Sequence, residues 1–203
     1  ARRAWVYNAG QRRVRRAPQV AYDAPGTASD GLRTADNFDM FNGSPDRYDW
    51  KLIGKKEMYI PYNNFKLEEK GLKYKDIIKP GHINPEYTRY ELHRVWEVKA
   101  TLKPGARNIY GARTLYFDED TWQAAVIDHY DGRGNLWRVA QGYAIQYYYA
   151  KVPWTSMEAL YDLNAKRYFA FGLDNEEGDS IVFDKAYSKK QFRPAALRQS
   201  GVR

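Results

Sequence analysis

The segment 90–102 constrains the fold most, because apolar and polar side chains alternate along it for thirteen residues. Its apolar positions are Tyr90, Leu92, Trp96, Val98, Ala100 and Leu102, with Arg94 as the exception. This period of two is typical of a β-strand with one face in a core and the other in solvent. At about 3.4 Å per residue the strand extends roughly 44 Å, well beyond the usual length, which favours a large and strongly curved sheet.

Shorter predicted strands follow and are separated by turn-forming residues such as those at 132–135 and 164–166. No segment between them has the length and the 3.6-residue period of a crossover helix. The predicted fold is therefore mainly β, a curved antiparallel sheet with a few short helices. The predicted strands are Ile109–Asp118, Ala124–Asp131, Leu136–Tyr149, Met157–Leu163 and Arg167–Leu173.

The first part of the chain is expected to be less regular. A hairpin is predicted from Arg2–Asn8 and Gln11–Ala17, and a short helix at Leu32–Phe41 with Ser29 or Asp30 as its N-cap. Two further strands are predicted, Tyr48–Ile53 and Glu57–Tyr62, followed by a polar loop over 63–85. The length of 203 residues is expected to form one domain, 1–203, with a sizeable core.

The net charge of +8 is concentrated at the two ends of the chain. Residues 1–20 carry six arginines and residues 185–203 carry six basic residues, neither with an acid, while the rest of the chain has a net charge of −4. A nucleic-acid channel needs basic residues spread along a groove with aromatic platforms between them. The pattern therefore argues against nucleic acid and favours an anionic surface or partner.

Nothing in the sequence forms a recognisable catalytic or metal-binding motif. The chain has no Cys, and its three histidines, at 82, 93 and 129, are too far apart for helical metal-ligand pairs. Asp128 and His129 are adjacent in a predicted strand and point to opposite faces, so they are not expected to act as a dyad. The acidic clusters 118–120 and 174–179 lack calcium-loop spacing, although the second leaves calcium open. We expect no catalytic residue, metal or cofactor.

Aromatic side chains recur on one face of the predicted strands. Their first interpretation is an ordinary core, but several strands are apolar on both faces, as in a sheet that wraps a cavity and is also covered outside. Such a cavity would accept an acyl chain or another amphipathic ligand. The candidate cavity residues are Tyr90, Leu92, Trp96, Trp137, Tyr143, Ile145 and Tyr147.

Three blocks of the sequence resemble the bacterial LolA/LolB-like superfamily of lipoprotein-sorting and lipid-carrier proteins. The first is Trp5-x-Tyr7 followed by Arg12-Arg13-Val14-Arg15-Arg16, with Ala9 where proline is usual. The second is the segment 41–49, Phe-Asn-Gly-Ser-Pro-Asp-Arg-Tyr-Asp. The third runs from 114–118 through Thr121-Trp122 to Tyr130-Asp131 and Gly134. More narrowly, the chain resembles the C-terminal half of a Gram-negative family of outer-membrane lipoproteins, domain of unknown function 1329, whose members end in a segment like 192–198.

This resemblance implies an unclosed barrel covered by short helices, with an apolar cavity and no catalytic residues. It also implies a place in the periplasm or at the outer membrane of a Gram-negative bacterium, and a link to envelope exporter components. The chain would then be the C-terminal part of a longer protein, whose N-terminal segment would complete the sheet.

These observations favour a non-enzymatic binding protein that shields or transfers a lipid-like ligand. Arg12, Arg13, Arg15 and Arg16 would contact anionic headgroups or a partner, and salt bridges to acids elsewhere in the chain are the alternative. A structural or interaction subunit of an envelope complex, without its own ligand, is the alternative function. A hydrolase would require a nucleophile that the sequence does not reveal.

Overall fold

The computed structural model describes residues 5–17, 22–178 and 181–201, and these residues fall into two compact units. The sheet unit comprises residues 22–178, and the terminal unit combines residues 5–17 with residues 181–201. The sequence was expected to form a single domain over 1–203, and we describe the two units separately.

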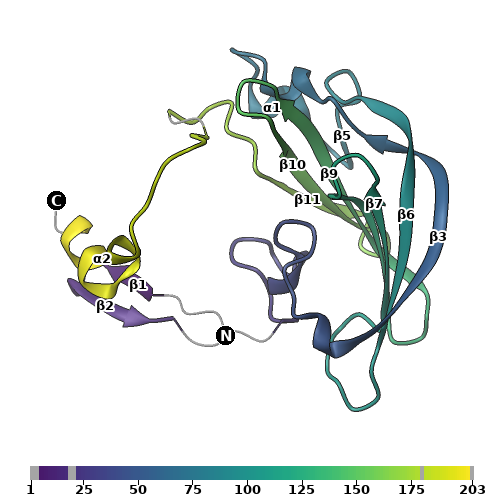
Figure 1. Ribbon diagram of the computed structural model, residues 1–203, viewed down its shortest axis with the longest axis horizontal. Helices are drawn as coiled ribbons and strands as arrows, with labels where there is room; N and C mark the ends of the chain where they lie inside the picture. Colours follow the sequence, from purple (N-terminus) through teal and green to yellow (C-terminus); the bar gives the residue numbers. More distant parts are fainter. Residues whose placement is uncertain (1–4, 18–21, 179–180, 202–203) are drawn as a thin grey trace. The chain divides into compact units, whose positions relative to one another are not determined.

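A seven-stranded antiparallel sheet forms the body of the sheet unit (Figure 1). From β6 to β11 each strand pairs with the next, and β3 pairs with the remaining edge of β6. Within the described residues β3 and β11 have no further strand partner, so the sheet does not close into a barrel. The predicted fold class is confirmed. The strands are β3 (Tyr48–Pro61), β6 (Tyr90–Leu102), β7 (Ala112–Asp118), β8 (Ala124–Tyr130), β9 (Leu136–Tyr147), β10 (Val152–Asp162) and β11 (Arg167–Phe171).

The strand boundaries show where the period-two pattern is reliable. The strand predicted at 90–102 is β6 with the same bounds. The two strands predicted before residue 63 are one strand, β3, because a register irregularity between Leu52 and Gly54 interrupts the alternation without ending the pairing. Similarly, β10 begins before the predicted Met157, because a bulge between Thr155 and Met157 breaks the pattern there.

The sheet curls strongly at one end. Residues 90–94, the start of β6, pair only with β3. The chain that leaves β3 reaches β9, although three strands separate β3 from β9 in the sheet. The Asn64 N–H donates to the Ala144 carbonyl at 3.0 Å, and the Gln146 amide donates to the Tyr62 hydroxyl at 2.8 Å. We call the face toward which β3 curls the inner face and the opposite face the outer face.

The helix predicted at Leu32–Phe41 is absent, and this prediction was wrong. Only a single 3-10 turn, η1 (Ala35–Asn37), forms there, and Asp39 and Met40 have left-handed backbone angles, with φ of 50° and 61°. The predicted cap residue Ser29 donates its hydroxyl to the Gly26 carbonyl instead. Tertiary partners explain the difference, because the polar groups of this segment bond to the sheet rather than to their own backbone.

The segment 22–47, which we call the strap, lies on the outer face and is held by buried charges. Asp36 forms an ion pair with Arg113 at 2.6 Å, and both side chains are almost completely buried. The rings of Phe41, Tyr48 and Tyr110 surround the Arg113 guanidinium at 5.0–5.1 Å. Removing one partner of such a pair leaves a buried charge uncompensated, so the strap is fixed to the sheet.

His129 and Arg138 extend this polar contact between the strap and the outer face. Asn37 Nδ2 lies 2.8 Å from His129 Nε2, and Arg138 donates to the Leu32 carbonyl at 2.9 Å and to Asp162 at 2.9 Å. Burial, together with nearby Arg113 and Arg138, holds the pKa of His129 well below its usual value. As predicted, His129 and Asp128 point to opposite faces, because Asp128 accepts a hydrogen bond from Tyr116 on the inner face.

Met40 joins the strap to the apolar core of the outer face. Its side chain packs with Leu115, Ile127 and Leu160. Gly142 leaves room for the Met40 sulfur, because a Cβ at that position would lie only 3.3 Å from it. Its backbone N–H donates to Glu158 Oε2 at 3.0 Å. Burial raises the pKa of Glu158 to about 7.

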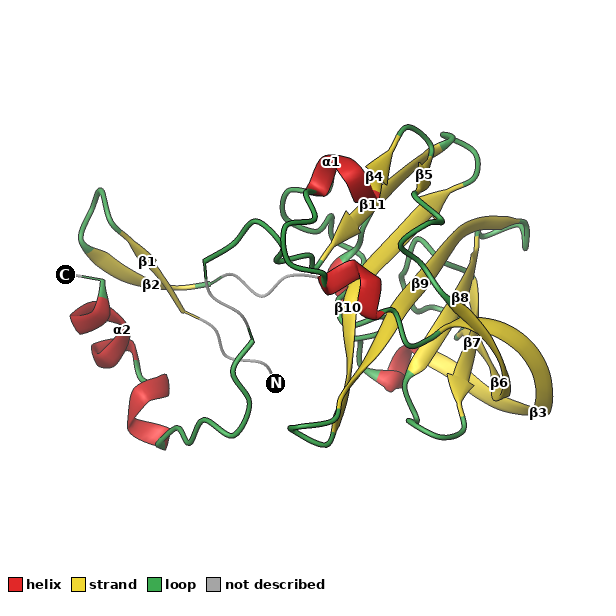
Figure 2. Cartoon of the chain, turned by 90° about the horizontal axis from the view of Figure 1, so that it is seen from above, coloured by secondary structure: helices red, strands yellow, loops and turns green. Residues whose placement is uncertain are grey.

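The segment 62–89, which we call the cover, was predicted to be a loop over most of its length. It contains short elements (Figure 2), each only two to four residues long. No helix among the described residues has the length and apolar character needed to cross a membrane. The elements of the cover are η3 (Phe65–Glu68), α1 (Tyr74–Ile77), β4 (Ile78–Lys79) and β5 (His82–Ile83).

The terminal unit consists of a hairpin and a short helix. The predicted hairpin is confirmed for β1 (Trp5–Asn8) and β2 (Arg13–Arg16), while Arg2 and Arg3 lie outside the described residues. After η4 (Lys189–Phe192), helix α2 (Pro194–Ser200) ends at Gly201, where a Cβ would lie 2.3 Å from the Tyr7 ring. The residue after α2 must therefore be small for the helix to pack on the hairpin.

Replacing Glu158 with Gln is expected to remove a pH dependence of stability. The folded state holds the proton more tightly than the unfolded state, so this contribution to the free energy of unfolding is complete below pH 4.5 and lost as the pH rises to about 7. The wild type should lose up to about 3 kcal/mol relative to E158Q across this range. Urea denaturation at several pH values measures it.

The matched control is Glu57→Gln, the same chemical change at an exposed position of β3. A difference between wild type and E158Q that stays constant with pH would contradict the assignment.

Candidate ligand-binding site on the inner face

The cover places apolar side chains directly on the inner face. Leu67 and Ile77 are fully buried against Tyr143, Met157 and Ala159 of β9 and β10. Two other cover residues, Leu72 and Ile83, belong to the same cluster. The side chains of the cover therefore occupy this part of the inner face.

A second apolar cluster fills the curled end of the sheet. Ile60 of β3 is fully buried against Val95, Tyr116 and Val126. The hollow beside it measures only about 10 Å³ and includes Tyr62 and Gln123 in its lining. That volume is close to the space that one water molecule needs, so this end holds no acyl chain in the conformation described.

Between the two clusters, two tyrosine hydroxyls meet at one amide, and a third lies next to one of them. Tyr143 and Tyr90 both donate to Gln141 Oε1, at 2.9 Å and 3.2 Å, and the Tyr161 hydroxyl lies 3.4 Å from that of Tyr143. Burial raises the pKa of Tyr143 and of Tyr161, so both phenols keep their protons. A ligand's ester or phosphate oxygens would have to compete with Gln141 Oε1 for the hydroxyl protons of Tyr143 and Tyr90.

Charged groups lie further along the inner face. Tyr116 donates to Asp128 at 3.0 Å, and Lys56 lies 4.3 Å from the centre of the Tyr116 ring and 3.0 Å from Glu97. Burial raises the pKa of Asp128. The inner face is thus apolar where the cover sits and polar beside it, which suits an amphipathic ligand better than a wholly apolar one.

The structure separates the seven candidate cavity residues. Tyr143 and Ile145 are buried on the inner face, the Tyr147 hydroxyl donates to Glu68 of the cover, and the Tyr90 hydroxyl joins the cluster at Gln141. The other three lie elsewhere. By the strand register Leu92 and Trp96 point to the outer face, and Trp137 contacts Tyr110 and donates to Asp162 there.

Sequence reasoning did not identify several residues of this site. Gln141 interrupts an aromatic face in the sequence, yet it is the acceptor on which the hydroxyls converge. The apolar residues of the cover are scattered at irregular spacing in a Lys-rich segment, so no period marked them. Tyr161 lies on the apolar face of the strand predicted at Met157–Leu163, and it was interpreted as a core residue.

A larger hollow lies away from the inner face. It measures about 630 Å³, opens to solvent, and is bordered by Arg47 and Arg107 together with strap residues such as Asp23 and Thr34. Arg47 donates to the Arg107 carbonyl at 2.7 Å and stacks on Tyr22 at 5.0 Å. Its border contains two arginines and an aspartate and none of the residues proposed for the apolar cavity.

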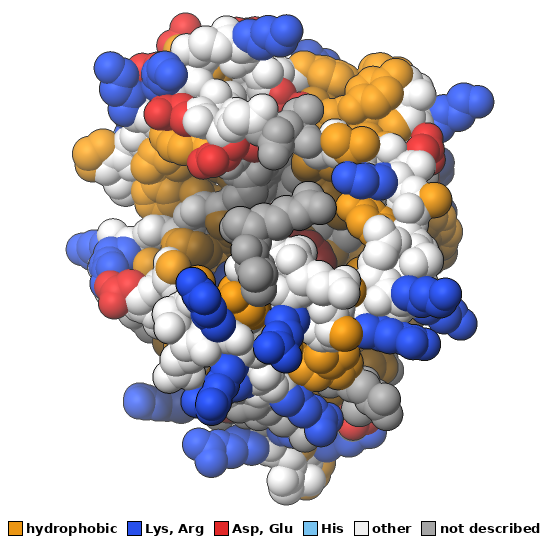
Figure 3. Space-filling view, turned by 90° about the vertical axis from the view of Figure 1, so that its left-hand side faces the viewer, with side chains coloured by type: hydrophobic (Ala, Val, Ile, Leu, Met, Phe, Trp, Pro, Cys, Tyr) orange, Lys and Arg blue, Asp and Glu red, His pale blue; other side chains and the backbone are white. Residues whose placement is uncertain are grey.

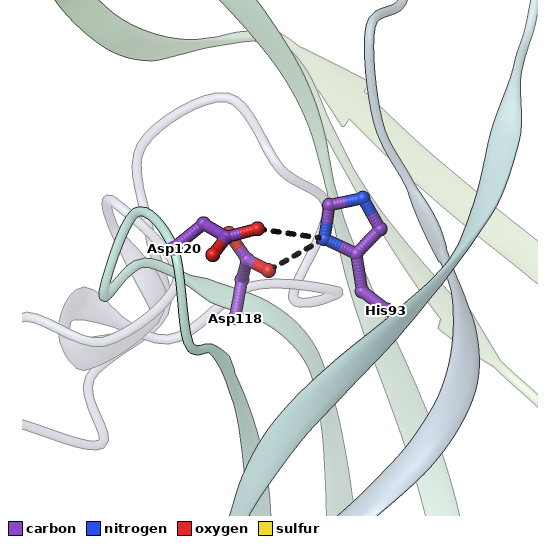
Figure 4. A group of neighbouring side chains, drawn as sticks. All are labelled: His93, Asp118 and Asp120. Carbon is purple, nitrogen blue, oxygen red and sulfur yellow. Dashed lines mark hydrogen bonds and ion pairs between the residues drawn. The ribbon is translucent and has the colours of Figure 1, made fainter.

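His93, Asp118 and Asp120 form the one cluster of potential metal ligands found in the described residues (Figure 4). His93 Nδ1 lies 2.8 Å from Asp118 and 3.8 Å from Asp120. The second oxygen of Asp118 accepts from the Thr121 N–H and hydroxyl, at 3.0 Å and 2.7 Å. These contacts tie the β7–β8 turn to β6, which gives the cluster a structural role.

The four arginines of the terminal hairpin are exposed. No ion pair among the described residues involves any of them, and the only acid in the described part of this unit is Asp184. The intramolecular salt bridges considered above are therefore not formed by the described acids. In Figure 3 basic side chains stand out across the lower part of the view, with few acidic side chains among them.

The fold is that of the open, curved sheets found in lipoprotein-sorting proteins. A domain from Vibrio parahaemolyticus, described as an outer membrane lipoprotein-sorting protein, matches 97% of this chain and 66% of its own with a TM-score of 0.54 and 12% identity. A DUF1329 family protein from Desulfovibrio piger matches 95% of this chain and 63% of its own, with a TM-score of 0.54 and 16% identity. At these identities the likeness shows the fold alone.

The family described as Protein of unknown function (DUF1329) matches residues 1–198, and the chain belongs to this family. The uncharacterized protein PA3922 of Pseudomonas aeruginosa is 66% identical over 202 residues. That match covers all of this chain and 44% of the relative, so the chain spans less than half of the relative's length. The family resemblance seen in the sequence motifs is confirmed.

Proposed function

We propose that this chain shields or transfers a lipid-like ligand on the inner face of its sheet, without catalysing a reaction. The observation that carries the proposal is the cover, whose apolar side chains sit on the inner face of an unclosed sheet. The fold of lipoprotein-sorting proteins supports it. A ligand would bind by taking the place of Leu67, Leu72, Ile77 and Ile83.

Exchange between cover and ligand gives a physical basis for reversible binding. An acyl chain gains about 0.8 kcal/mol for each CH₂ that leaves water, which binds a long chain firmly. Displacing the cover exposes its own apolar side chains and offsets part of that gain. The net affinity is then low enough for release, as a transfer protein requires.

Four of the candidate residues keep a place in this proposal. Tyr143, Ile145 and Tyr147 would line the site once the cover moves, and Tyr90 would offer its hydroxyl beside Gln141. The chain would act at the periplasmic face of a Gram-negative outer membrane, where lipids and lipoproteins need a carrier. Envelope exporter components and the N-terminal segment of the same protein are the proposed partners.

A structural subunit of an envelope complex remains the alternative, since both cores are fully packed in the conformation described. Native mass spectrometry of the purified protein distinguishes the two functions. Lipid that copurifies with the protein supports carriage, whereas a clean mass supports the structural role.

Two truncations in the same cluster test the exchange between cover and ligand. Ile77 belongs to the cover and Met157 to the sheet, and both are fully buried. Each change to Ala should lower the free energy of unfolding by about 2–5 kcal/mol. Ile77→Ala should strengthen the binding of a fluorescent fatty-acid analogue several-fold, because it weakens the competitor. Met157→Ala should weaken binding, because it removes part of the site.

The comparison works because destabilisation alone would change binding in the same direction in both variants. Binding titrations monitored by fluorescence, with unlabelled phospholipid as the displacing ligand, measure the effect. Equal changes in the two variants, or no binding by the wild type, would contradict the proposal.

We also propose that the terminal hairpin contacts anionic headgroups. Binding to vesicles containing phosphatidylglycerol should weaken with added salt, because the arginines are exposed and attraction between exposed charges is screened. Replacing Arg12, Arg13, Arg15 and Arg16 with Gln should weaken binding by roughly fivefold per arginine. Vesicle cosedimentation measures both effects.

The control replaces four exposed lysines of the sheet unit with Gln, which changes the net charge equally; these are Lys51, Lys70, Lys75 and Lys99. An equal loss in both variants would show a response to net charge rather than contact by the hairpin.

A further inference from the structure

Exposed aromatic side chains gather at one end of the sheet. In an antiparallel meander the β7–β8 turn, the β9–β10 turn and the last residues of β3 lie at the same end. Gln123 of the first turn donates to the carbonyl of Pro153, the second residue of β10, at 3.0 Å, so the two turns are neighbours. We call this group the aromatic rim: Tyr59, Phe65, Trp122, Tyr148, Tyr149 and Trp154.

The exposure of these rings is large. Trp122 is 68% exposed, Tyr148 72% and Tyr149 77%, and the turns at the opposite end contain one aromatic residue, the fully buried Tyr110. Phe65 of the cover stacks on Tyr148 with 6.0 Å between ring centres. Among the turns of the sheet, exposed aromatic rings thus occur at one end, and a partner surface explains this better than folding does.

Trp122 shows that folding does not account for the rim. Its φ is 60°, in the left-handed region where Gly or Asn would cost less than a bulky side chain. The indole stacks on Trp96 at 6.4 Å and remains mostly in solvent. A strained backbone that presents an exposed Trp indicates a function for that side chain.

The chemistry of the rim fits the interfacial zone of a lipid bilayer. Trp and Tyr have an apolar ring and a polar tip, and both are enriched where one end of the side chain is apolar and the other wet. Within the described residues, the indole N–H groups of Trp122 and Trp154 have no hydrogen-bond partner, and Lys151 beside Tyr149 has no ion pair. The two indole N–H groups and the lysine suit ester and phosphate groups.

The acidic turn beside Trp122 does not oppose this contact. Glu119 is paired with Lys55 and with Arg94, the latter at 2.6 Å, and Asp118 is bonded to His93. Only Asp120 is largely exposed, and it too lies near His93. Glu119 is therefore compensated by two basic side chains, and Asp118 is engaged in a hydrogen bond with His93.

We propose that the aromatic rim is a membrane-contact surface, which rests in the interfacial zone of a bilayer with its rings among the headgroups. This contact is independent of ligand carriage on the inner face. It would place the curled end of the sheet, where the cover begins, against the membrane.

Quenching of Trp fluorescence by phosphatidylcholine vesicles with brominated acyl chains tests the proposal. These vesicles have no net charge, so the arginine hairpin contributes little and the signal reports the rim. The wild type should be quenched, and Trp122→Ser combined with Tyr149→Ser should weaken partitioning by at least about tenfold. Trp50→Ser is the control, since Trp50 is 36% exposed near the opposite end of β3.

Thermal melts identify any variant that fails to fold. Tyr148→Ser removes another mostly exposed ring of the rim and should also weaken partitioning into the vesicles. No quenching of the wild type, or an equal loss for the Trp50 and rim variants, would overturn the proposal. The proposal would also be wrong if the protein bound only to anionic vesicles and the rim substitutions left that binding unchanged. The terminal hairpin would then make the membrane contact, and the rim would be assigned to a protein interface. Failure to carry lipid with quenching intact would overturn the proposed function and leave the rim proposal standing.

Discussion

A sheet that curls without closing must bury two faces, and the rest of this structure depends on how that is done. Neither face is covered by a long helix. The outer face is covered by the strap and the inner face by the cover, both irregular segments of the same chain. Irregular backbone cannot satisfy its own polar groups, so each segment needs specific partners on the sheet.

The two segments are held by different forces, and this difference bears on function. The strap depends on buried charges, above all Asp36 with Arg113, for which a lipid offers no substitute. The cover is held by hydrogen bonds, such as those from Tyr168 to the Lys79 and His82 carbonyls, and by the apolar contacts of Leu67 and Ile77. The apolar contacts are non-directional, so an apolar group of similar shape can replace them. Of the two segments, the cover is therefore the one that we propose a lipid displaces.

The separation of polar and apolar groups gives each part of the molecule its own interaction chemistry. The inner face combines apolar walls with tyrosine hydroxyls, the terminal hairpin presents unpaired arginines, and the rim presents exposed rings. Together they are consistent with a protein that works between a lipid ligand and a membrane. The family, the curved fold and the packing of both faces are shown, and the activity is our proposal.

The sequence by itself determined the fold class, the bounds of β6, the terminal hairpin and the family. The two-residue alternation of apolar and polar side chains is a property of the chain itself, so β6 was predicted with the bounds it has. The order of the family motifs is also a property of the sequence alone. Only the tertiary structure decided what covers the sheet. Asp36 and Met40 looked like parts of a helix until Arg113 and Glu158, which are distant in sequence, supplied stronger partners. The face on which Trp96 lies, opposite to Tyr143, likewise depended on strand register, which local pattern does not fix when both faces are apolar.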